Sequence, residues 1–277
     1  MKNIKRISIL AAVLVLSLGV LASCGGGNDS ADKTIVVAAS PTPHAVILNS
    51  DAVKNALADQ GFTVEVKEFD DYVQPNVATT DGDVDANYFQ HVPYLDEYNA
   101  ENGTELVAVA NVHYEPMGVY TGTKKSFDEL EEGDKICIPN DATNGARALL
   151  LLQDNGVIKL KEDAGVTATE KDVVENPKNV VIEPLEAAAI PASLEDPKVA
   201  LGVINANYAI GAGLNIADAI ASEQVDSLAA ETYVNVIVVN KGNEESEKTK
   251  ALVAALQTDE VKAFIESEFN GAVVAKF

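Results

Sequence analysis

The chain has 277 residues, of which 47% are hydrophobic, and a formal net charge of −23. This length suits two domains of ordinary size, and the hydrophobic fraction is ample for their cores. The acidity argues against nucleic acid as a partner, because phosphates require a basic face, and against a basic patch that binds a membrane surface.

The first 23 residues have the organisation of a secretory leader. Three cations within the first six residues precede an apolar run over residues 7–21, which is too short for a comfortable membrane span. The run ends in Leu-Ala-Ser-Cys, with Cys24 as its last residue. This ending resembles the bacterial lipobox, which implies cleavage before Cys24 and acyl chains such as palmitate on that residue. An ordinary signal peptide with an incidental cysteine is the alternative.

Residues 24–33 are rich in glycine and small polar residues, a composition typical of a flexible tether. A lipid-modified Cys24 anchors a chain to the cell membrane without spanning it, so we expect the folded part to lie outside the cytoplasm. We expect no membrane-spanning segment after the leader, because no later stretch is long and apolar enough.

Residues 34–117 show strand patterns that alternate with helix patterns. This alternation predicts an α/β unit built on a mostly parallel sheet. The strand patterns cover residues 34–39, 64–69, 84–86 and 106–112, and the helix patterns cover residues 44–60, 75–80 and 93–102.

Residues 118–231 predict a second α/β unit, and the tail is expected to return to the first one. Lobe I then comprises residues 34–117 plus 232–277, and lobe II comprises residues 118–231. Two crossovers between the lobes would form a hinge around a central ligand cleft. The remaining strand patterns cover residues 136–138, 180–182, 199–204 and 234–239, and the helix patterns cover residues 143–156, 245–256 and 259–269.

The helix predicted over residues 143–156 carries an unusual cation, Arg147. It is the only arginine after the leader, since the chain's other arginine is Arg6. A planar guanidinium grips a carboxylate with two parallel hydrogen bonds, which lysine cannot do. We therefore expect Arg147 to hold the carboxylate of a small ligand near the helix N-terminus. A surface salt bridge on an acidic protein is the alternative.

The densest aromatic stretch of the chain covers residues 87–95 and lies between a predicted strand and a predicted helix. Ligands bind at such positions in α/β sheets. Phe89 and His91 are candidates for the wall of an apolar pocket with a polar rim. Packing in the core is the alternative, and it is favoured for Tyr94.

Two asparagines mark further candidate positions. Asn205 follows the strand over residues 199–204 and could bind the polar end of a ligand, or simply cap a helix. Asn235 lies inside a β-branched run, where a buried polar side chain must find a partner. A bridge to the backbone at the hinge is the alternative role for Asn235.

The sequence gives little support for a metal site or for catalysis. His44, His91 and His113 are the only histidines, and no zinc-protease, serine-hydrolase or phosphate-loop motif occurs. Cys137 lies in an apolar strand and is interpreted as an inert buried thiol. We therefore expect no catalytic residues, no metal and no cofactor.

Four segments together resemble the methionine-binding lipoproteins of bacterial ABC importers, the MetQ/NlpA family. The resemblance spans about the whole mature chain and implies a two-lobed periplasmic-binding-protein fold that closes on a free amino acid. The segments are Asp85–Tyr98, Ile138–Gln153, Val173–Val180 and Tyr233–Val239.

The resemblance also implies roles for individual residues. Arg147 would hold the α-carboxylate, and Asn205 and Asn235 would help to fix the polar end of the amino acid. The remaining implied residues line or flank the side-chain pocket: Tyr88, Phe89, His91, Asn144 and Tyr114, the last in a crossover stretch expected to vary within the family.

The implied function is that of a monomeric receptor that binds L- and possibly D-methionine and delivers it to an ABC permease with its ATPase subunit. Another amino acid or a methionine-containing dipeptide is the alternative ligand. A surface-anchored enzyme or an adhesin is the alternative class of protein, although we find no nucleophile or metal site for the enzyme.

Overall fold

The computed structural model describes residues 33–277. The predicted leader, the lipid-bearing Cys24 and nearly all of the tether lie outside the described residues. Between residues 33 and 277, none of the helices has both the length and the apolar character needed to cross a membrane.

The larger of two main sheets, sheet A, has the strand order β13-β4-β12-β3-β1-β2. Strands β1, β2 and β3 run parallel to one another, whereas β12, β4 and β13 pair with antiparallel neighbours. The strands are β1 (Thr34–Ala39), β2 (Thr63–Glu68), β3 (Ala86–His91), β4 (Leu106–Tyr114), β12 (Val234–Asn240) and β13 (Val274–Ala275).

The second main sheet, sheet B, has the order β11-β5-β10-β6-β9, and β7 and β8 form a separate pair. Its β10, β6 and β9 are parallel to one another, whereas β5 is antiparallel to both of its neighbours, β10 and β11. The strands are β5 (Gly118–Thr121), β6 (Lys135–Pro139), β7 (Lys159–Leu160), β8 (Val173–Glu175), β9 (Val181–Leu185), β10 (Val199–Ile204) and β11 (Ala221–Ser222).

The four strands β1 to β4 run in one direction, as the prediction of a mostly parallel sheet for residues 34–117 requires, because β12 is antiparallel to both β3 and β4. The strands that run against the others are β12 and β13 in sheet A and β5 in sheet B, and β5 and β12 are the first strands after the two crossovers. Strand β4 leads through residues 115–117 into β5, and β11 leads through residues 223–233 into β12. A strand that enters from the other sheet need not follow the direction set by strand-helix-strand units.

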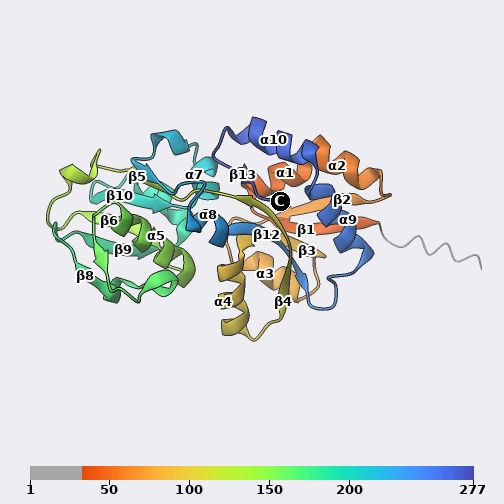
Figure 1. The fold of residues 1–277 in the computed structure, drawn as a ribbon, viewed down its shortest axis with the longest axis horizontal. Coiled ribbons are helices and arrows are strands. Elements are labelled where there is room, and N and C mark those ends of the chain that lie inside the picture. The colour runs from red at the N-terminus through yellow and green to blue at the C-terminus, as the bar shows by residue number, and fades with distance from the viewer. Residues whose placement is uncertain (1–32) are drawn as a thin grey trace, which may run out of the picture. The chain divides into compact units, whose positions relative to one another are not determined.

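The fold is therefore a two-lobed α/β architecture with two crossovers between the lobes, as predicted. In Figure 1, sheet A is drawn in red, orange, yellow and blue, and sheet B in green and cyan. The residue numbers at which each lobe begins and ends stay a prediction.

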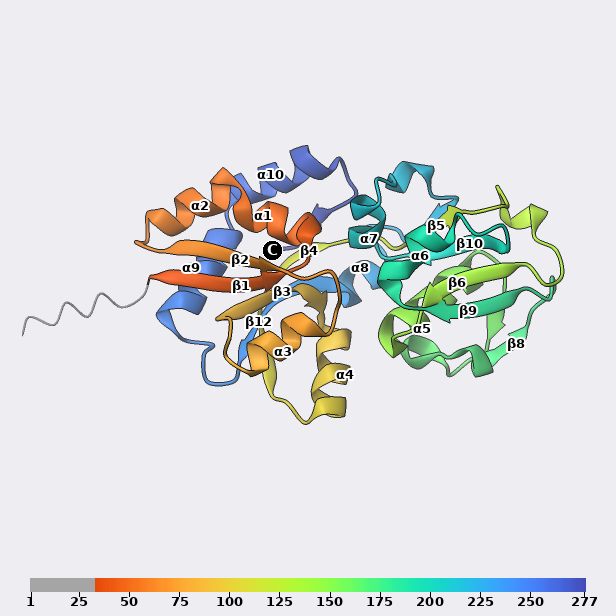
Figure 2. The same ribbon diagram turned by 180° about the vertical axis from the view of Figure 1, so that it is seen from behind.

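Helices cover both faces of sheet A. In both views α1, α2 and α10 lie on one side of this sheet, and α3 and α4 lie on the other (Figures 1 and 2). A continuous apolar cluster joins sheet A to the helices α1, α2, α9 and α10. These helices are α1 (Val46–Asn49), α2 (Asp51–Ala58), α3 (Gln74–Thr80), α4 (Val92–Asn102), α9 (Glu247–Leu256) and α10 (Asp259–Phe269).

Sheet B has its own core against α5, and Met117 and Leu149 are fully buried there. Cys137 is also buried, and its pKa is raised by burial, as the prediction of an inert thiol requires. The helices on this side and at the second crossover are α5 (Ala142–Asp154), α6 (Ile190–Ser193), α7 (Ala206–Gly211) and α8 (Leu228–Thr232).

Two predicted elements differ from the structure. The helix expected over residues 44–60 is interrupted at Ser50, whose extended backbone ends α1 while its hydroxyl accepts a hydrogen bond from Val53 N and caps α2. The strand expected over residues 84–86 lies later, over Ala86–His91. The aromatic stretch that was expected between a strand and a helix is thus itself mostly strand.

Candidate functional site

A small cavity lies where residues of both sheets meet. Its accessible volume of about 30 Å³ is well below the range of about 300–1,000 Å³ for ligand pockets, so the lining side chains are closely packed in this structure. Its lining residues are His44, Tyr72, Phe89, Gln90, His91, Tyr94, Glu115, Asn144, Arg147, Asn205, Ala206, Asn207 and Asn235.

The topology explains why these residues meet. The parallel strands β1, β3, β6 and β10 all direct their carboxyl ends toward the cavity, and the segments that follow them supply most of the lining. Strand β12 runs antiparallel to β3, so the start of β12 lies beside the carboxyl end of β3. Asn235, near the start of β12, therefore pairs with His91 at the cavity. The first crossover supplies Glu115.

Arg147 lies in the second turn of α5, which is capped at its N-terminus by Asp141. Its Nε donates to Glu223 Oε1 at 2.8 Å, and its Nη2 donates to Glu223 Oε2 at 2.5 Å. Nη2 also donates to the backbone oxygen of Glu115 at 2.8 Å, and the guanidinium lies 4.4 Å from the centre of the Tyr233 ring. Arg147 is 4% exposed, so this is a buried bidentate ion pair.

Each partner of this ion pair stabilises the charged form of the other. Burial alone would raise the pKa of Glu223, but Arg147 outweighs burial and holds it below the usual value. Burial also opposes the charge on Arg147, and Glu223 overcomes that effect and raises the pKa of Arg147. Both groups are therefore ionised at neutral pH.

The ion pair with Glu223 limits which nitrogens of Arg147 are available to bind the carboxylate of a ligand. Glu223 already occupies the edge formed by Nε and Nη2. Within residues 33–277, Nη1 has no protein hydrogen-bond partner, and Arg147 lines the cavity. Both N–H groups of Nη2 are also in use, so Nη1 is the part of the guanidinium left for a ligand.

The three predicted asparagines all line the cavity. Asn205 Nδ2 donates to Asn144 Oδ1 at 2.8 Å, and Asn144 Nδ2 donates to Asp141 at 2.9 Å. Asn205 Oδ1 is buried and has no hydrogen-bond partner. The Asn205 side chain does not cap α7, so the alternative of a simple helix cap does not account for it.

Asn235 also has a side-chain partner instead of the expected bridge to the backbone. Its Oδ1 lies 2.9 Å from Nε2 of His44. His91, on the neighbouring strand, caps α4 through Nδ1, which accepts from Tyr94 N at 3.2 Å. The other ring nitrogen of His91 lies 3.2 Å from Asn144 Oδ1. Burial, with Arg147 nearby, lowers the pKa of His91 to about 3, so the ring is neutral.

Three aromatic rings form a group in the cavity wall. The ring centre of Tyr72 lies 6.1 Å from that of Phe89 and 5.9 Å from that of Tyr94. Tyr94 donates its hydroxyl to Tyr72 O at 3.0 Å, and Tyr72 donates to Asn207 Oδ1 at 2.6 Å. The preference for Tyr94 as a core residue was wrong, because its ring is part of the cavity wall.

Two predicted residues do not reach the cavity. Tyr88 is fully buried in the core of sheet A, and Tyr114 is buried with its hydroxyl bonded to Glu223 at 2.7 Å. A bulge in β3 explains the difference between neighbours, because Val236 pairs with Gln90 and Ile237 with Tyr88, which leaves Phe89 as the extra residue. Bulges of this kind redirect side chains.

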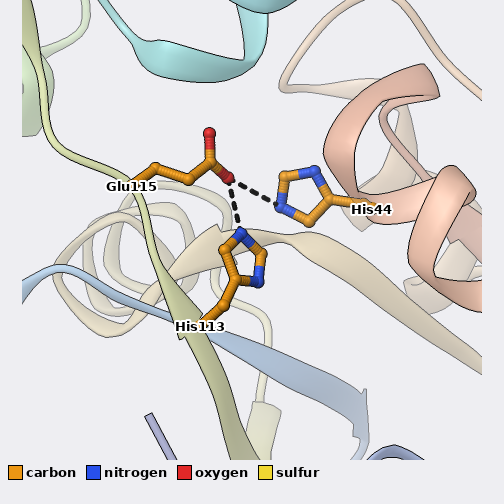
Figure 3. Close-up of side chains that lie close together, drawn as sticks. All are labelled: His44, His113 and Glu115. Atoms are coloured by element: carbon orange, nitrogen blue, oxygen red, sulfur yellow. Dashed lines mark hydrogen bonds and ion pairs between the residues drawn. The ribbon is translucent and has the colours of Figure 1, made fainter. Parts of the chain in front are cut away.

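A cluster of titratable groups lies at the wall near Asn235. Glu115 Oε1 lies 2.7 Å from Nε2 of His113 and 3.4 Å from Nε2 of His44, and all three side chains are buried (Figure 3). The Tyr88 hydroxyl bonds to Nδ1 of His113. Burial lowers the pKa of His44 to about 4 and of His113 to about 3, and it raises the pKa of Glu115.

The sequence patterns did not indicate this cluster or the ring of Tyr72. His44 and Glu115 are 71 positions apart, so no local spacing joins them. The sequence His-Tyr-Glu at residues 113–115 places two of the groups on one side of an extended chain, because side chains two positions apart share a face. That was the one available signal.

Comparison with known proteins identifies the family. The model of the NlpA lipoprotein family matches residues 35–277. The chain is 43% identical over 274 residues to the D-methionine-binding lipoprotein MetQ of Escherichia coli K12, with 97% of this chain and 98% of the relative covered.

Solved structures agree with this match. A lipoprotein from Ruminococcus gnavus is 56% identical with a TM-score of 0.85, and covers 88% of this chain and 100% of its own. A nutrient-binding protein from Burkholderia cenocepacia bound to methionine is 43% identical with a TM-score of 0.82, over the same shares of the two chains. The chain therefore belongs to the NlpA lipoprotein family, whose members are substrate-binding proteins of transport and not enzymes.

Proposed function

We propose that this protein is the lipid-anchored receptor of an ABC amino-acid importer, and that it binds methionine between its two lobes and delivers it to the permease. The observation that carries the proposal is the cavity itself, which is lined by a buried arginine, by asparagines and by aromatic rings. This combination matches a ligand with a zwitterionic head and an apolar side chain.

The chemistry of the lining residues supports the assignment. Arg147 Nη1 and the unpartnered Asn205 Oδ1 offer a donor and an acceptor to the head of an amino acid. Phe89, Tyr72 and Tyr94 offer ring edges and faces, against which a polarisable thioether packs well. A micromolar affinity requires about 8 kcal/mol, which a desolvated polar head and a buried side chain can supply.

The proposal covers both enantiomers of methionine. The Escherichia coli relative is named for D-methionine, and the Burkholderia cenocepacia relative was solved with methionine. The protein is proposed to act as a monomer, with a permease and an ATPase subunit as its partners.

Native mass spectrometry of the full-length protein in detergent tests the ligand. The protein is measured as purified, after denaturation and refolding, and after addition of L- or D-methionine. We expect a mass excess equal to methionine that is lost on refolding and regained on addition. An excess of another mass would assign a different amino acid or a dipeptide, and no uptake from an amino-acid mixture would contradict the receptor role.

The anchor has a separate test. Substitution of Cys24→Ala removes the proposed site of lipidation, so the protein should leave the membrane fraction and lose labelling by a fatty-acid probe. Persistent lipid labelling of C24A would refute the lipobox assignment.

A further inference from the structure

Glu115 is a buried carboxylate that lines the cavity and has no permanent cation as its partner. Its side chain is 7% exposed, and its ion-pair contacts within residues 33–277 are the rings of His44 and His113. A buried charge is costly unless a counter-charge or several donors compensate it. The identity of its neighbours therefore decides what Glu115 can do.

The hydrogen-bond network assigns a proton to each histidine nitrogen that faces Glu115. The one partner of the Tyr88 hydroxyl among the described residues is His113 Nδ1, so Tyr88 donates there, and Nε2 of His113 carries the proton that it donates to Glu115. His44 Nε2 faces two acceptors, Glu115 Oε1 and Asn235 Oδ1, so it carries a proton as well.

Both imidazoles are therefore neutral donors that orient a carboxylate without cancelling its charge. Figure 3 shows that both contacts end on the same oxygen of Glu115, and that the second oxygen points away from the two rings. The backbone N–H of Asn207 is a further neutral donor to the Glu115 carboxylate.

Arg147 does not supply the missing cation. Both of its hydrogen-bonded side-chain contacts go to the Glu223 carboxylate, and it reaches Glu115 only through the backbone oxygen of that residue. The charge of Arg147 lowers the pKa of Glu115, but the arginine is paired with Glu223, and burial still raises the pKa of Glu115, so its negative charge is not balanced at the cavity wall. The free acceptor Asn205 Oδ1, also buried at this cavity, adds a second group that requires a donor.

We propose that Glu115 is the anionic partner of the ligand's ammonium group, and that the site thereby selects amino-acid ligands with a free primary amine. This inference rests on the proposed function and adds its main charge-selective residue. An ammonium group has several N–H donors, so it can satisfy Glu115 and Asn205 Oδ1 together. It also neutralises the one unbalanced charge at the wall.

A divalent metal ion is the competing occupant, because ligand atoms of His44, His113 and Glu115 all lie within 4.8 Å of one another. The geometry disfavours it. Two atoms bound to one tetrahedral zinc lie about 3.3 Å apart, given bonds of about 2.0–2.1 Å, whereas His113 Nε2 and Glu115 Oε1 are 2.7 Å apart. Both Nε2 atoms also direct protons, not lone pairs, toward the centre of the cluster.

The test is a matrix of two ligands and three proteins, measured by isothermal titration calorimetry on the full-length protein in detergent. The ligands are L-methionine and 4-(methylthio)butanoate, which lacks the amine. The proteins are wild type, Glu115→Gln, and the control Glu186→Gln, which removes an exposed carboxylate whose charge acts on Tyr94 but which does not line the cavity.

We expect wild type to prefer methionine over the deaminated analogue by roughly 100-fold, and E115Q to lose at least about 30-fold in methionine affinity. The affinity of E115Q for 4-(methylthio)butanoate should stay the same or rise, because its carboxylate no longer meets an unbalanced negative charge. E186Q should behave as wild type for both ligands.

Equal losses of affinity for both ligands in E115Q would overturn the proposal. Equal affinity of the wild-type protein for both ligands would also overturn it, and this result does not depend on any variant. If wild type ignores methionine, the proposed function fails first; if E115Q binds methionine as wild type does, only the role of Glu115 fails. The titrations are repeated with EDTA and with Zn²⁺, and a zinc dependence that E115Q abolishes would assign the cluster to a metal instead.

Discussion

Glu223 and Glu115 are two buried acids near Arg147, yet their surroundings have opposite effects on the pKa of their carboxyl groups. Glu223 accepts from two guanidinium nitrogens, from the Tyr114 hydroxyl and from Met117 N, and its pKa is lowered. Glu115 meets only neutral donors on its side chain, and burial raises its pKa. Burial alone therefore does not predict the role of a buried acid; the charge of its partner does.

The difference separates a structural charge from a binding charge. Glu223 belongs to the second crossover, and its contacts join α5 to Tyr114 and Met117 on either side of the first crossover. Glu223 therefore links the two chain segments that join the lobes. Glu115 is left with an unbalanced charge beside the cavity, which is the condition for binding a cationic group.

The largest effect is expected from Arg147→Lys. A lysine keeps the charge but cannot donate to both oxygens of Glu223 and to a ligand together. We expect methionine affinity to fall by roughly 100-fold or more, measured by calorimetry on protein whose folding is checked by circular dichroism. Unchanged affinity would rule out Arg147 as the group that holds the ligand's carboxylate.

The comparison of the two acids predicts opposite changes in stability. Glu223→Gln leaves Arg147 buried beside a neutral group, so the free energy of unfolding should fall by about 1–3 kcal/mol. Glu115→Gln removes an unbalanced charge and keeps an oxygen that accepts from His113, so the ligand-free protein should be as stable as wild type or more stable. Urea unfolding of both variants measures this, and a destabilised, ligand-free E115Q would contradict the comparison.

Stability should rise with pH between about pH 4 and 6.5. Burial lowers the pKa of His44 to about 4 and of His113 to about 3 in the folded protein. The unfolded chain therefore binds more protons than the folded chain in this window, so stability is lost as the pH falls below 6.5. The raised pKa of Glu115 opposes this trend.

Substitution of His113→Phe isolates the histidine contribution. We expect a smaller loss of stability between pH 7.5 and 5 in H113F than in wild type, measured as the urea midpoint at each pH. An unchanged difference between the two pH values would show that His113 binds protons equally in the folded and the unfolded protein.

The smallest effect is expected from Asn235→Ala, which removes one polar group from the cavity and the acceptor of His44 Nε2. Methionine affinity should fall by roughly 10-fold with the fold intact. Asn240→Ala is the matched control, because Asn240 lies at the other end of β12 and bonds to Thr79 O. Loss of the folded state in N235A would make Asn235 a structural residue.

Local sequence patterns were enough to place many elements. β1, β10 and α10 have the predicted bounds, because each is a continuous apolar or periodic run between clear breaks. The end of α5 is also as predicted, with Asn155 at the C-cap and Gly156 at a φ of 71°. The interruption at Ser50 was missed, because a serine inside an apolar periodic pattern is compatible with a continuous helix.

The site was predictable in part for the same reason. Residues that follow apolar strands, such as Asn205 and His91, were identified because the ends of parallel strands form ligand sites. Phe89 and Tyr88 are adjacent in sequence, and only the bulge opposite Val236 and Ile237 directs one to the cavity and leaves the other in the core. Strand alternation alone does not reveal such an insertion.

The sequence by itself determined the two-lobed α/β class, the positions of most strands and helices, and the rarity of arginine that singled out Arg147. Only the tertiary structure decided the partners of the buried charges. Glu223 is 76 positions from Arg147, and Glu115 is 71 positions from His44. Which side chains meet at such separations depends on strand register and on the path of the crossovers, and these are set by packing of the whole chain.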